Sequence, residues 1–246
     1  MIAIILAGGY AKRLWPLTLN TPKALLPLAG KPVIDYVIEK IFNVSPPVEK
    51  IIVSTNLKFQ RQFEMWLEAK RYSNVELLPD ASTGESEKIG AVMALHNITS
   101  NFNSDFLVVA GDSLFIDDLY GLIQFFKEKQ SPVVALYQTK DLDEAKKGAT
   151  AILNEEGRIV EFIEKPINPK TTLAGACLYI FPSRIKTKLR EYVNLGMPRD
   201  EPGHFIQWLH KGEPVYGCML KNHFWDIGTL KSYREANAYL KALKGE

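Results

Sequence analysis

Short apolar runs alternate with amphipathic stretches over the first 140 residues, and this alternation restricts the fold more than any other feature. Apolar side chains at 33, 34, 37, 38, 41 and 42 have the spacing of one helix face. Strands are predicted at 2–7, 50–54, 75–78, 106–110 and 133–137, and helices at 33–42, 59–69, 91–98 and 119–126. This order predicts right-handed βαβ units, and hence an α/β, Rossmann-like, doubly wound fold on a mostly parallel, mixed sheet.

The pattern changes after about residue 140. Two strand candidates, 149–153 and 158–163, flank a turn-like Asn154-Glu-Glu-Gly157 and predict a β-hairpin. A strand at 176–181, a short helix to about 193, a helical stretch from 202, a strand at 214–220 and a helix at about 230–243 follow. No repeat or long linker separates these parts. We therefore expect one domain over 1–246, with a core at 1–140 and an inserted and closing part at 141–246.

Composition excludes several classes of protein. Hydrophobic residues make up 46% and charged residues 24%, as in ordinary globular proteins, and the net charge of +2 gives no reason to expect a nucleic-acid or membrane partner. The opening apolar run ends at Gly8, too short to span a membrane. Cys177 and Cys218 lack metal spacing and indicate buried thiols in a reducing compartment. A cytoplasmic protein is expected, and a homo-oligomer is left open.

The strongest local signal is the segment from Leu6 to Pro27, which begins where the first predicted strand ends. In open α/β sheets, ligands bind beyond the carboxyl ends of strands. Gly8 and Gly9 let backbone N–H groups approach a phosphate closely, while Arg13 and Lys23 offer cations. The segment matches neither Gly-x-Gly-x-x-Gly nor the P-loop, so it predicts a different kind of triphosphate site.

The whole string resembles the sugar-phosphate nucleotidyltransferase family, which includes glucose-1-phosphate thymidylyltransferase. The matching residues are Gly8-Gly9, Arg13-Leu14, Pro16, Thr18, Pro22-Lys23, Leu25-Leu26-Pro27 and Lys31-Pro32. The resemblance implies that Arg13 holds the outgoing phosphates and that Lys23 lies near the reacting ones, which makes these two the expected catalytic residues. It implies a nucleotide site formed by Leu6, Ala7, Gly8, Gly9, Arg13, Gly90 and Asp112.

Two aspartates are the expected metal ligands. Asp112 follows Gly111 at the end of an apolar strand, where a carboxylate beside a triphosphate is a natural ligand for Mg²⁺. Asp226 alone would indicate a turn or a helix cap. The family carries both Gly-Asp and Asp-x-Gly-Thr and binds its metal with both aspartates, so the resemblance implies Mg²⁺ as the cofactor.

The family also has a Glu-Lys-Pro that contacts the sugar phosphate, matched here by Glu164-Lys165-Pro166. The resemblance implies that Glu164 contacts sugar hydroxyls, Lys165 contacts the phosphate, and Gly148 and Gly175 line the sugar. It thereby assigns the nucleotide to 1–140 and the sugar phosphate to 141–246. Two departures leave the substrates open: the family's Asn-Ala-Gly is Gly175-Ala176-Cys177 here, and its Leu-Gly-Thr-Ala-Gly-Ala is Ser86-Glu-Lys-Ile-Gly90-Ala91.

The favoured function is transfer of a nucleotide from dTTP or UTP to glucose 1-phosphate, with release of pyrophosphate. GTP-dependent mannose-1-phosphate guanylyl transfer and a catalytically silent regulatory subunit are the alternatives. A glycosyltransferase would be expected to carry Asp-x-Asp beside the central strand, and Asp112-Ser-Leu does not fit that motif.

Overall fold

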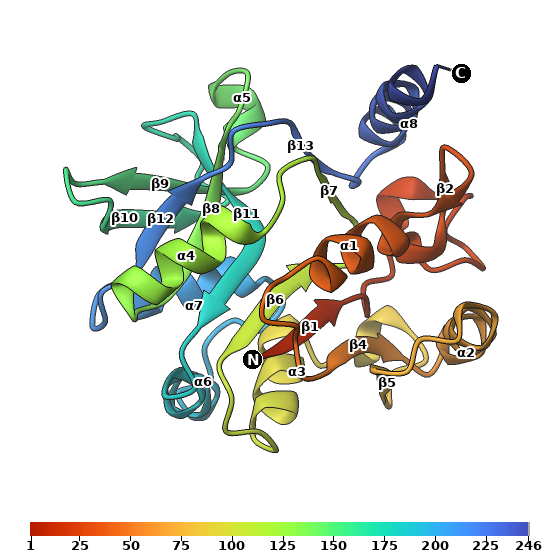
Figure 1. The fold of residues 1–246 in the computed structure, drawn as a ribbon. Coiled ribbons are helices and arrows are strands. Elements are labelled where there is room, and N and C mark those ends of the chain that lie inside the picture. The colour runs from red at the N-terminus through yellow and green to blue at the C-terminus, as the bar shows by residue number, and fades with distance from the viewer. Residues whose placement is uncertain (246) are drawn as a thin grey trace. The chain divides into compact units, whose positions relative to one another are not determined.

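The protein has an α/β fold in a computed structural model that describes residues 1–245 (Figure 1). The chain forms two compact units. The N-terminal unit comprises Ala3–Lys88, Val109–Asp118 and 224–245; the central unit comprises Met1–Ile2, Ile89–Val108 and Leu119–His223. Their boundaries fall inside strands β1 (Ile2–Leu6) and β6 (Phe106–Ala110), and each unit is described by itself.

The N-terminal unit is built on parallel strands in the order β1-β4-β5, with β4 at Ile51–Asn56 and β5 at Val75–Asp80. All six residues of β4 are buried, as expected for a strand covered on both faces. Helices α1 (Val33–Phe42) and α2 (Gln60–Lys70) join these strands. Buried Asp35 on α1 accepts a hydrogen bond from Trp66 Nε1 at 2.9 Å and pairs with Lys70 Nζ at 2.6 Å, so the two helices are fastened to each other.

A second core in this unit anchors the glycine-rich segment. The segment contains the 3₁₀ turns η1 (Lys12–Leu14) and η2 (Lys23–Leu25), then β2 (Pro27–Leu28) and β3 (Lys31–Pro32). Its leucines pack with residues of β7 (Ser113–Phe115) and α8 (Leu230–Lys244). The buried members of this cluster are Leu14, Leu26, Leu28, Ala29, Val33, Leu114, Ile227, Ala236 and Leu240. A fully buried leucine stabilises a fold by about 1.5–3 kcal/mol. This contribution is the structural reason for the leucines in the glycine-rich segment.

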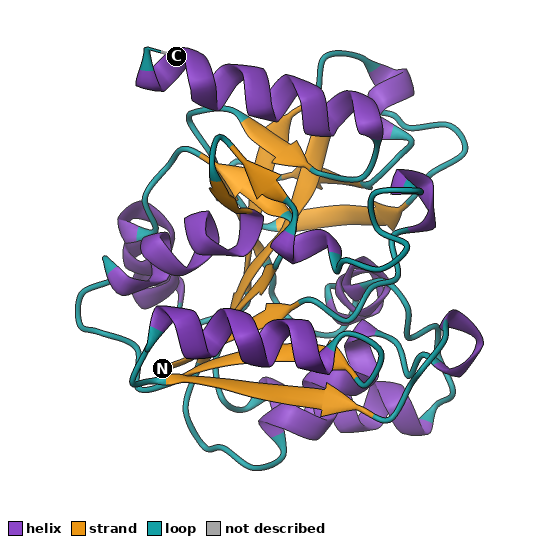
Figure 2. Ribbon diagram, turned by 90° about the vertical axis from the view of Figure 1, so that its right-hand side faces the viewer, coloured by secondary structure: helices purple, strands orange, loops and turns teal. Residues whose placement is uncertain are grey.

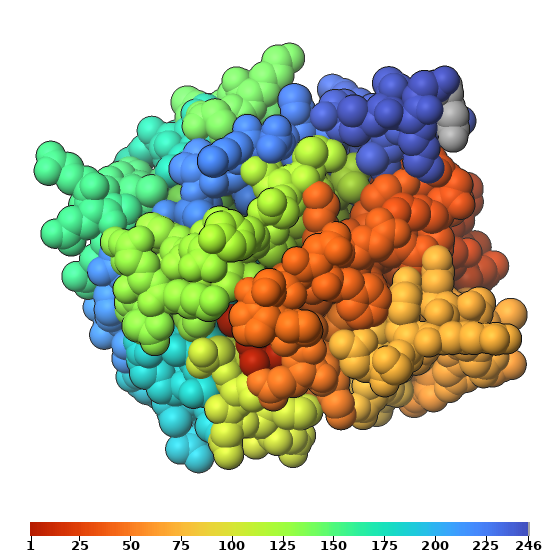
Figure 3. Space-filling model, viewed as in Figure 1, coloured from red at the N-terminus to blue at the C-terminus, as the bar shows by residue number. Residues whose placement is uncertain are grey.

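The central unit holds a mixed sheet. Strands β9 (Ala149–Leu153), β10 (Ile159–Glu164), β11 (Leu173–Phe181) and β8 (Val133–Gln138) pair antiparallel in the order β10-β9-β11-β8, and β12 (Tyr216–Met219) adds to β8 in parallel. Its helices are α3 (Ala91–Thr99), α4 (Tyr120–Lys129), α5 (Leu142–Ala145), α6 (Ile185–Asn194) and α7 (Pro202–Leu209). Figure 2 colours the helices and strands of both units, and part of α4 lies on the face drawn in Figure 3.

The expected α/β class with a mixed sheet is confirmed, as is the hairpin β9–β10. The structure adds one pairing that the sequence pattern did not indicate. Strand β7 pairs antiparallel with β13 (Phe224–Asp226), which places Ser113 opposite Asp226. The functional division near residue 140 stays a prediction. Within residues 1–245, helices fall short of the length and apolar character that a membrane crossing needs.

Candidate functional site

The loop after β1 is fixed at its start and open at its second glycine. Ala7 N donates to Ser54 O at 2.8 Å, and the Gly8 carbonyl accepts a hydrogen bond from the Asn56 side chain at 2.9 Å. Asn56 is fully buried at the end of β4. A Cβ added to Gly9 would meet no atom within 4 Å, so the backbone there borders open space. The loop therefore offers room for a ligand beside a well-held strand end.

Asp112 is positioned by a close approach of two chain segments. Gly111 N donates to Leu6 O at 2.8 Å. A Cβ on Gly111 would lie 3.1 Å from Ile5 Cγ2 and 3.2 Å from Ala7 Cβ, tighter than ordinary contact. Glycine at 111 thus lets the chain turn tightly beside the end of β1, and the next side chain, Asp112, emerges beside the loop.

The β7–β13 pairing brings the two predicted metal ligands to one lysine. Ile227 N donates to Asp112 O at 3.2 Å. Lys23 Nζ forms an ion pair with Asp112 Oδ2 and lies 3.9 Å from Asp226 Oδ1. The Lys23 and Asp112 side chains are 17% and 18% exposed, against 60% for Asp226. Solvent screens the Lys23–Asp112 pair less than it screens an exposed pair, which strengthens the attraction between the two charges.

Arg13 extends the same group. A Cβ built on Gly228 would lie 3.1 Å from Asp226 Oδ2 and 3.4 Å from Arg13 Nη2, so the guanidinium and the carboxylate both border this glycine. Arg13 is on η1, whose N-cap residue Ala11 is left-handed with φ 46°, and Thr18 Oγ1 donates to the Ala11 carbonyl at 2.7 Å. The structure therefore brings together Arg13, Lys23, Asp112 and Asp226, four of the residues that the sequence singles out.

The donor set fits Mg²⁺ bound together with a phosphorylated substrate. Mg²⁺ in such sites takes one or two carboxylates and completes its shell with phosphate oxygens and water. Asp112, the residue before β7, and Asp226, the last residue of β13, supply two hard oxygen donors. Among residues 1–245, no group of three or more His, Cys, Asp and Glu side chains is placed to hold a metal by itself. The arrangement matches an ion that arrives with its phosphates.

The segment after β5 folds back on the glycine-rich segment. Glu85, on the 3₁₀ turn η3 (Glu85–Glu87), pairs with Lys12 Nζ at 2.7 Å, while Glu87 Oε2 accepts the Thr83 backbone N–H at 2.8 Å. Accepting that hydrogen bond lowers the pKa of Glu87.

Gly90 belongs to the central unit, where it precedes α3 with φ +86°, and a Cβ there would lie 2.5 Å from Arg199 O. Its predicted nucleotide contact stays a prediction.

The residues expected at the sugar phosphate gather within the central unit. Lys165 N donates to Gly148 O at 3.0 Å, and Lys165 has the left-handed φ of +47°. Gly175 pairs with Ala149, the residue after Gly148, and a Cβ on it would lie 3.2 Å from the Phe162 ring. Strand register thus assembles these residues, although their contact with a sugar stays a prediction.

Glu164 is the most perturbed acid of this group. Its backbone N–H donates to Gln207 Oε1 on α7 at 2.8 Å. Its carboxylate lies so close to Gly203 on α7 that a Cβ there would overlap Oε2. Burial and the nearby Glu201 carboxylate raise the pKa of Glu164 to about 7, against the opposing effect of Lys165. Glu164 is therefore partly protonated at neutral pH.

Glu201 is a member of this group that the sequence analysis missed. It is the N-cap residue of α7, and its carboxylate pairs with Lys165 Nζ instead of capping the helix. The available signal was Pro202: proline is favoured at the first position of a helix, so Glu201 had to precede that helix. Its proximity to Lys165 depends on tertiary packing.

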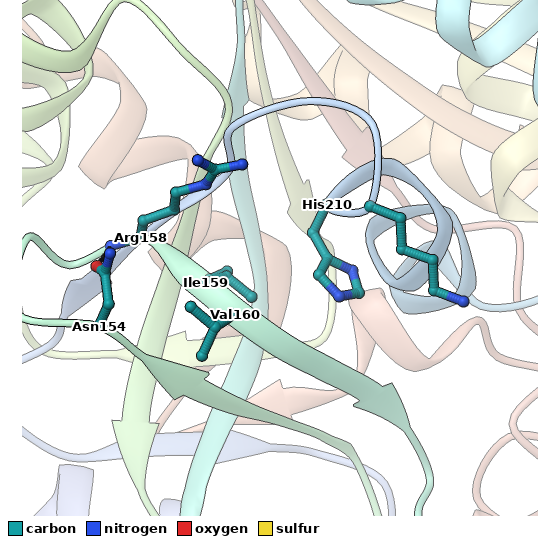
Figure 4. A pocket seen from close by; sticks show the side chains of 6 residues that line it. Asn154, Arg158, Ile159, Val160 and His210 are labelled. Atoms are coloured by element: carbon teal, nitrogen blue, oxygen red, sulfur yellow. Dashed lines mark hydrogen bonds between the residues drawn. The ribbon is translucent and has the colours of Figure 1, made fainter.

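A separate hollow of about 450 Å³ lies in the central unit (Figure 4). It is lined by Asn154, Arg158, Ile159, Val160, His210 and Lys211. Burial lowers the pKa of His210. None of the predicted site residues lines this hollow, so we do not assign the expected chemistry to it.

Comparisons with known proteins give one consistent family. The model of the nucleotidyl transferase family matches residues 2–242. The bifunctional protein GlmU of Methanocaldococcus jannaschii is 32% identical over 98% of this chain and 54% of its own length. A putative mannose-1-phosphate guanyltransferase of Sulfolobus acidocaldarius is 30% identical over 98% of this chain and 64% of its own. The chain thus spans between half and two thirds of the length of these two relatives.

A solved structure agrees over nearly the whole chain. The structure of a putative glucose-1-phosphate thymidylyltransferase from Bacillus anthracis superposes with a TM-score of 0.82 at 25% identity, covering 97% of this chain and 95% of that one. The similarity includes both units of the present chain. The match therefore covers both groups of predicted site residues.

Proposed function

Because the chain belongs to the nucleotidyl transferase family, we propose that it joins a nucleoside triphosphate to a sugar 1-phosphate and releases pyrophosphate. The observation that carries the proposal is the convergence of Arg13, Lys23, Asp112 and Asp226 in the unit that also holds the open backbone at Gly9. Such a group suits a triphosphate with its metal better than it suits a neutral ligand.

The proposed reaction is an in-line displacement. A phosphate oxygen of the sugar 1-phosphate forms a bond to the α-phosphorus, the bond from that phosphorus to the bridging oxygen breaks, and pyrophosphate leaves with the electron pair. The attacking oxygen is already anionic at neutral pH, so the reaction needs no Ser–His pair. Catalysis then depends on alignment and on charge stabilisation.

The protein's own residues divide these tasks. Arg13 holds the phosphates that leave, and Lys23 stabilises charge that develops near the α-phosphate. Lys165 binds the phosphate of the sugar, and Glu164 contacts its hydroxyls. Asp112 and Asp226 would hold Mg²⁺, which would neutralise phosphate charge and polarise the phosphorus–oxygen bonds.

We propose dTTP or UTP as the nucleotide and glucose 1-phosphate as the acceptor. The name of the Bacillus anthracis protein supports thymidylyl transfer to glucose 1-phosphate. The name of the Sulfolobus relative supports the alternative, guanylyl transfer to mannose 1-phosphate. A silent regulatory subunit is disfavoured because Arg13, Lys23, Asp112, Lys165 and Asp226 are all present.

The test is a panel of dTTP, UTP, GTP, ATP and CTP against glucose, mannose and N-acetylglucosamine 1-phosphates, with pyrophosphate release as the signal. We expect turnover that requires added Mg²⁺. Asp226→Asn should abolish most of it, whereas Lys50→Ala, which removes an exposed ion pair with Glu76, should not. No release from any pair, or full release in excess chelator, would contradict the proposal.

A second comparison separates the two substrates. Arg13→Ala should raise the KM of the triphosphate, and Lys165→Ala should raise the KM of the sugar phosphate. The reason is that the two cations lie in different units of the fold. Equal effects of both changes on both KM values would refute this division.

A further inference from the structure

Two carboxylates and one ammonium form a compact group in the central unit, which we call the charge cluster: Glu164, Lys165 and Glu201. Lys165 is the cation that pairs with Glu201. Glu164 is confined because its carboxylate lies against Gly203 in the first turn of α7, where a side chain on residue 203 would collide with it. The cluster thus holds more acid than base in a restricted space.

The groups that face Glu164 come from three elements. Lys165 follows it on the chain, Glu201 is the N-cap residue of α7, and Tyr179 lies on β11 with Cys177 beside it. Tyr179 is 4% exposed, and burial, Cys177 and Glu164 all raise its pKa, so the phenol stays neutral. Lys165 is therefore the cation that offsets the charge of Glu164.

We propose that binding of the sugar phosphate makes Glu164 take up a proton, with Glu201 as the residue that tunes this uptake. The proposal rests on the proposed function. A phosphate that binds Lys165 neutralises the ammonium and adds negative charge next to Glu164. It also draws Lys165 from Glu201 and leaves that carboxylate without its partner. Both changes disfavour the ionised form of Glu164.

The consequence for binding follows from linkage. Burial and nearby negative charge raise the pKa of Glu164 to about 7 in the free protein. Both effects are stronger in the complex, so the pKa of Glu164 is higher there. Above pH 7 the free protein has lost the proton that the complex needs, so the KM of the sugar phosphate should rise by up to about tenfold per pH unit. The sugar phosphate's own second ionisation, near pH 6, is complete in this range.

The experiment measures the KM of the sugar 1-phosphate from pH 6.5 to 8.5, with glucose 1-phosphate or whichever panel member has the lowest KM. Wild type should show the rise above pH 7. Glu164→Gln, which has no proton to take up, should give a flat profile. Glu201→Gln should begin its rise at a lower pH, because removing one carboxylate makes Glu164 a stronger acid. A residue that only supports the fold would not move the profile.

Calorimetry gives an independent readout. Titration of the same sugar phosphate at pH 7.5, in chelator with the preferred triphosphate present, should show buffer-dependent heats that correspond to roughly half a proton or more taken up. Glu164→Gln should abolish this dependence. Glu161→Gln is the matched control, since Glu161 lies on the same strand and pairs with Lys170 at 2.8 Å outside the cluster.

A flat wild-type KM profile, an unchanged rise in Glu164→Gln, or an unchanged profile in Glu201→Gln would each overturn the proposal. Each of these outcomes leaves the proposed function standing, because turnover is still observed. Absence of turnover with every pair of substrates would instead contradict the proposed function.

Discussion

Glu164→Gln should make the protein more stable at pH 8 than the wild type, although it removes a residue of the proposed site. Glutamine has nearly the same shape and no charge, so it fits the confined place beside Gly203 without ionising. In the folded wild type the pKa of Glu164 is raised from 4.5 to about 7, chiefly by burial. At a pH between these two values, Glu164 therefore carries a proton in the folded state and has lost it in the unfolded chain.

The sign and size follow from proton linkage. Because the folded state binds more protons between pH 4.5 and 7, the free energy of unfolding of the wild type falls as pH rises through this window. One pKa unit corresponds to about 1.4 kcal/mol, so between pH 5 and pH 8 the wild type should lose about 2.5 kcal/mol that Glu164→Gln keeps. For a chain of this size that is a difference of about 5–10 °C in Tm.

The assay is urea unfolding of both proteins at pH 5, 6, 7 and 8, followed by circular dichroism. The difference in free energy of unfolding should grow with pH and level off above pH 7. Glu161→Gln is the control, because Glu161 pairs with Lys170 and its removal should give no such divergence. Parallel pH profiles for wild type and Glu164→Gln would show that this carboxyl is not desolvated in the folded protein.

Three further predictions concern the N-terminal unit and the start of α3. Gly90→Ala should lower the free energy of unfolding by about 1–3 kcal/mol in urea titrations, because φ +86° and the Arg199 carbonyl both exclude a side chain. Gly9→Ala should leave that free energy unchanged, since its Cβ would meet no atom within 4 Å, yet weaken triphosphate binding in direct titrations. Lys23→Ala should bind triphosphate within about tenfold of wild type and lose on the order of a hundredfold in kcat; preserved kcat with lost binding would make Lys23 a tether.

The local pattern of apolar residues predicted those helices and strands in which buried side chains recur at a regular spacing. Helix α1 has the predicted bounds, Val33–Phe42, because its apolar residues recur on one face. Strand β6, Phe106–Ala110, was also predicted within its bounds, since a strand buried on both faces is a continuous apolar run. These features depend on neighbours in sequence, and they define most of the α/β framework.

The site was only partly accessible from the sequence. Asp226 has no local pattern that indicates a metal ligand, and only the family resemblance predicts that role, which stays a prediction. Its partner strand β7 is three residues long, too short for periodicity to reveal the pairing that places Asp226 beside Lys23. Glu201 was missed because its meeting with Lys165 joins residues 36 positions apart, which α7 and the strand end bring together.

The N-terminal unit draws on three separate stretches of the chain, so it can be completed only after the third stretch has been synthesised. The last stretch, 224–245, supplies Asp226 and also the helix residues Ala236 and Leu240 that close the leucine cluster. Domains generally fold as units once their residues have emerged from the ribosome. A nascent chain that has reached His223 already contains all of the central unit, yet it has neither the second aspartate nor the helix that packs the glycine-rich segment. Synthesis of residues 224–245 therefore completes the proposed phosphate-binding group, and chains that stop before Asp226 should be unable to consume nucleotide.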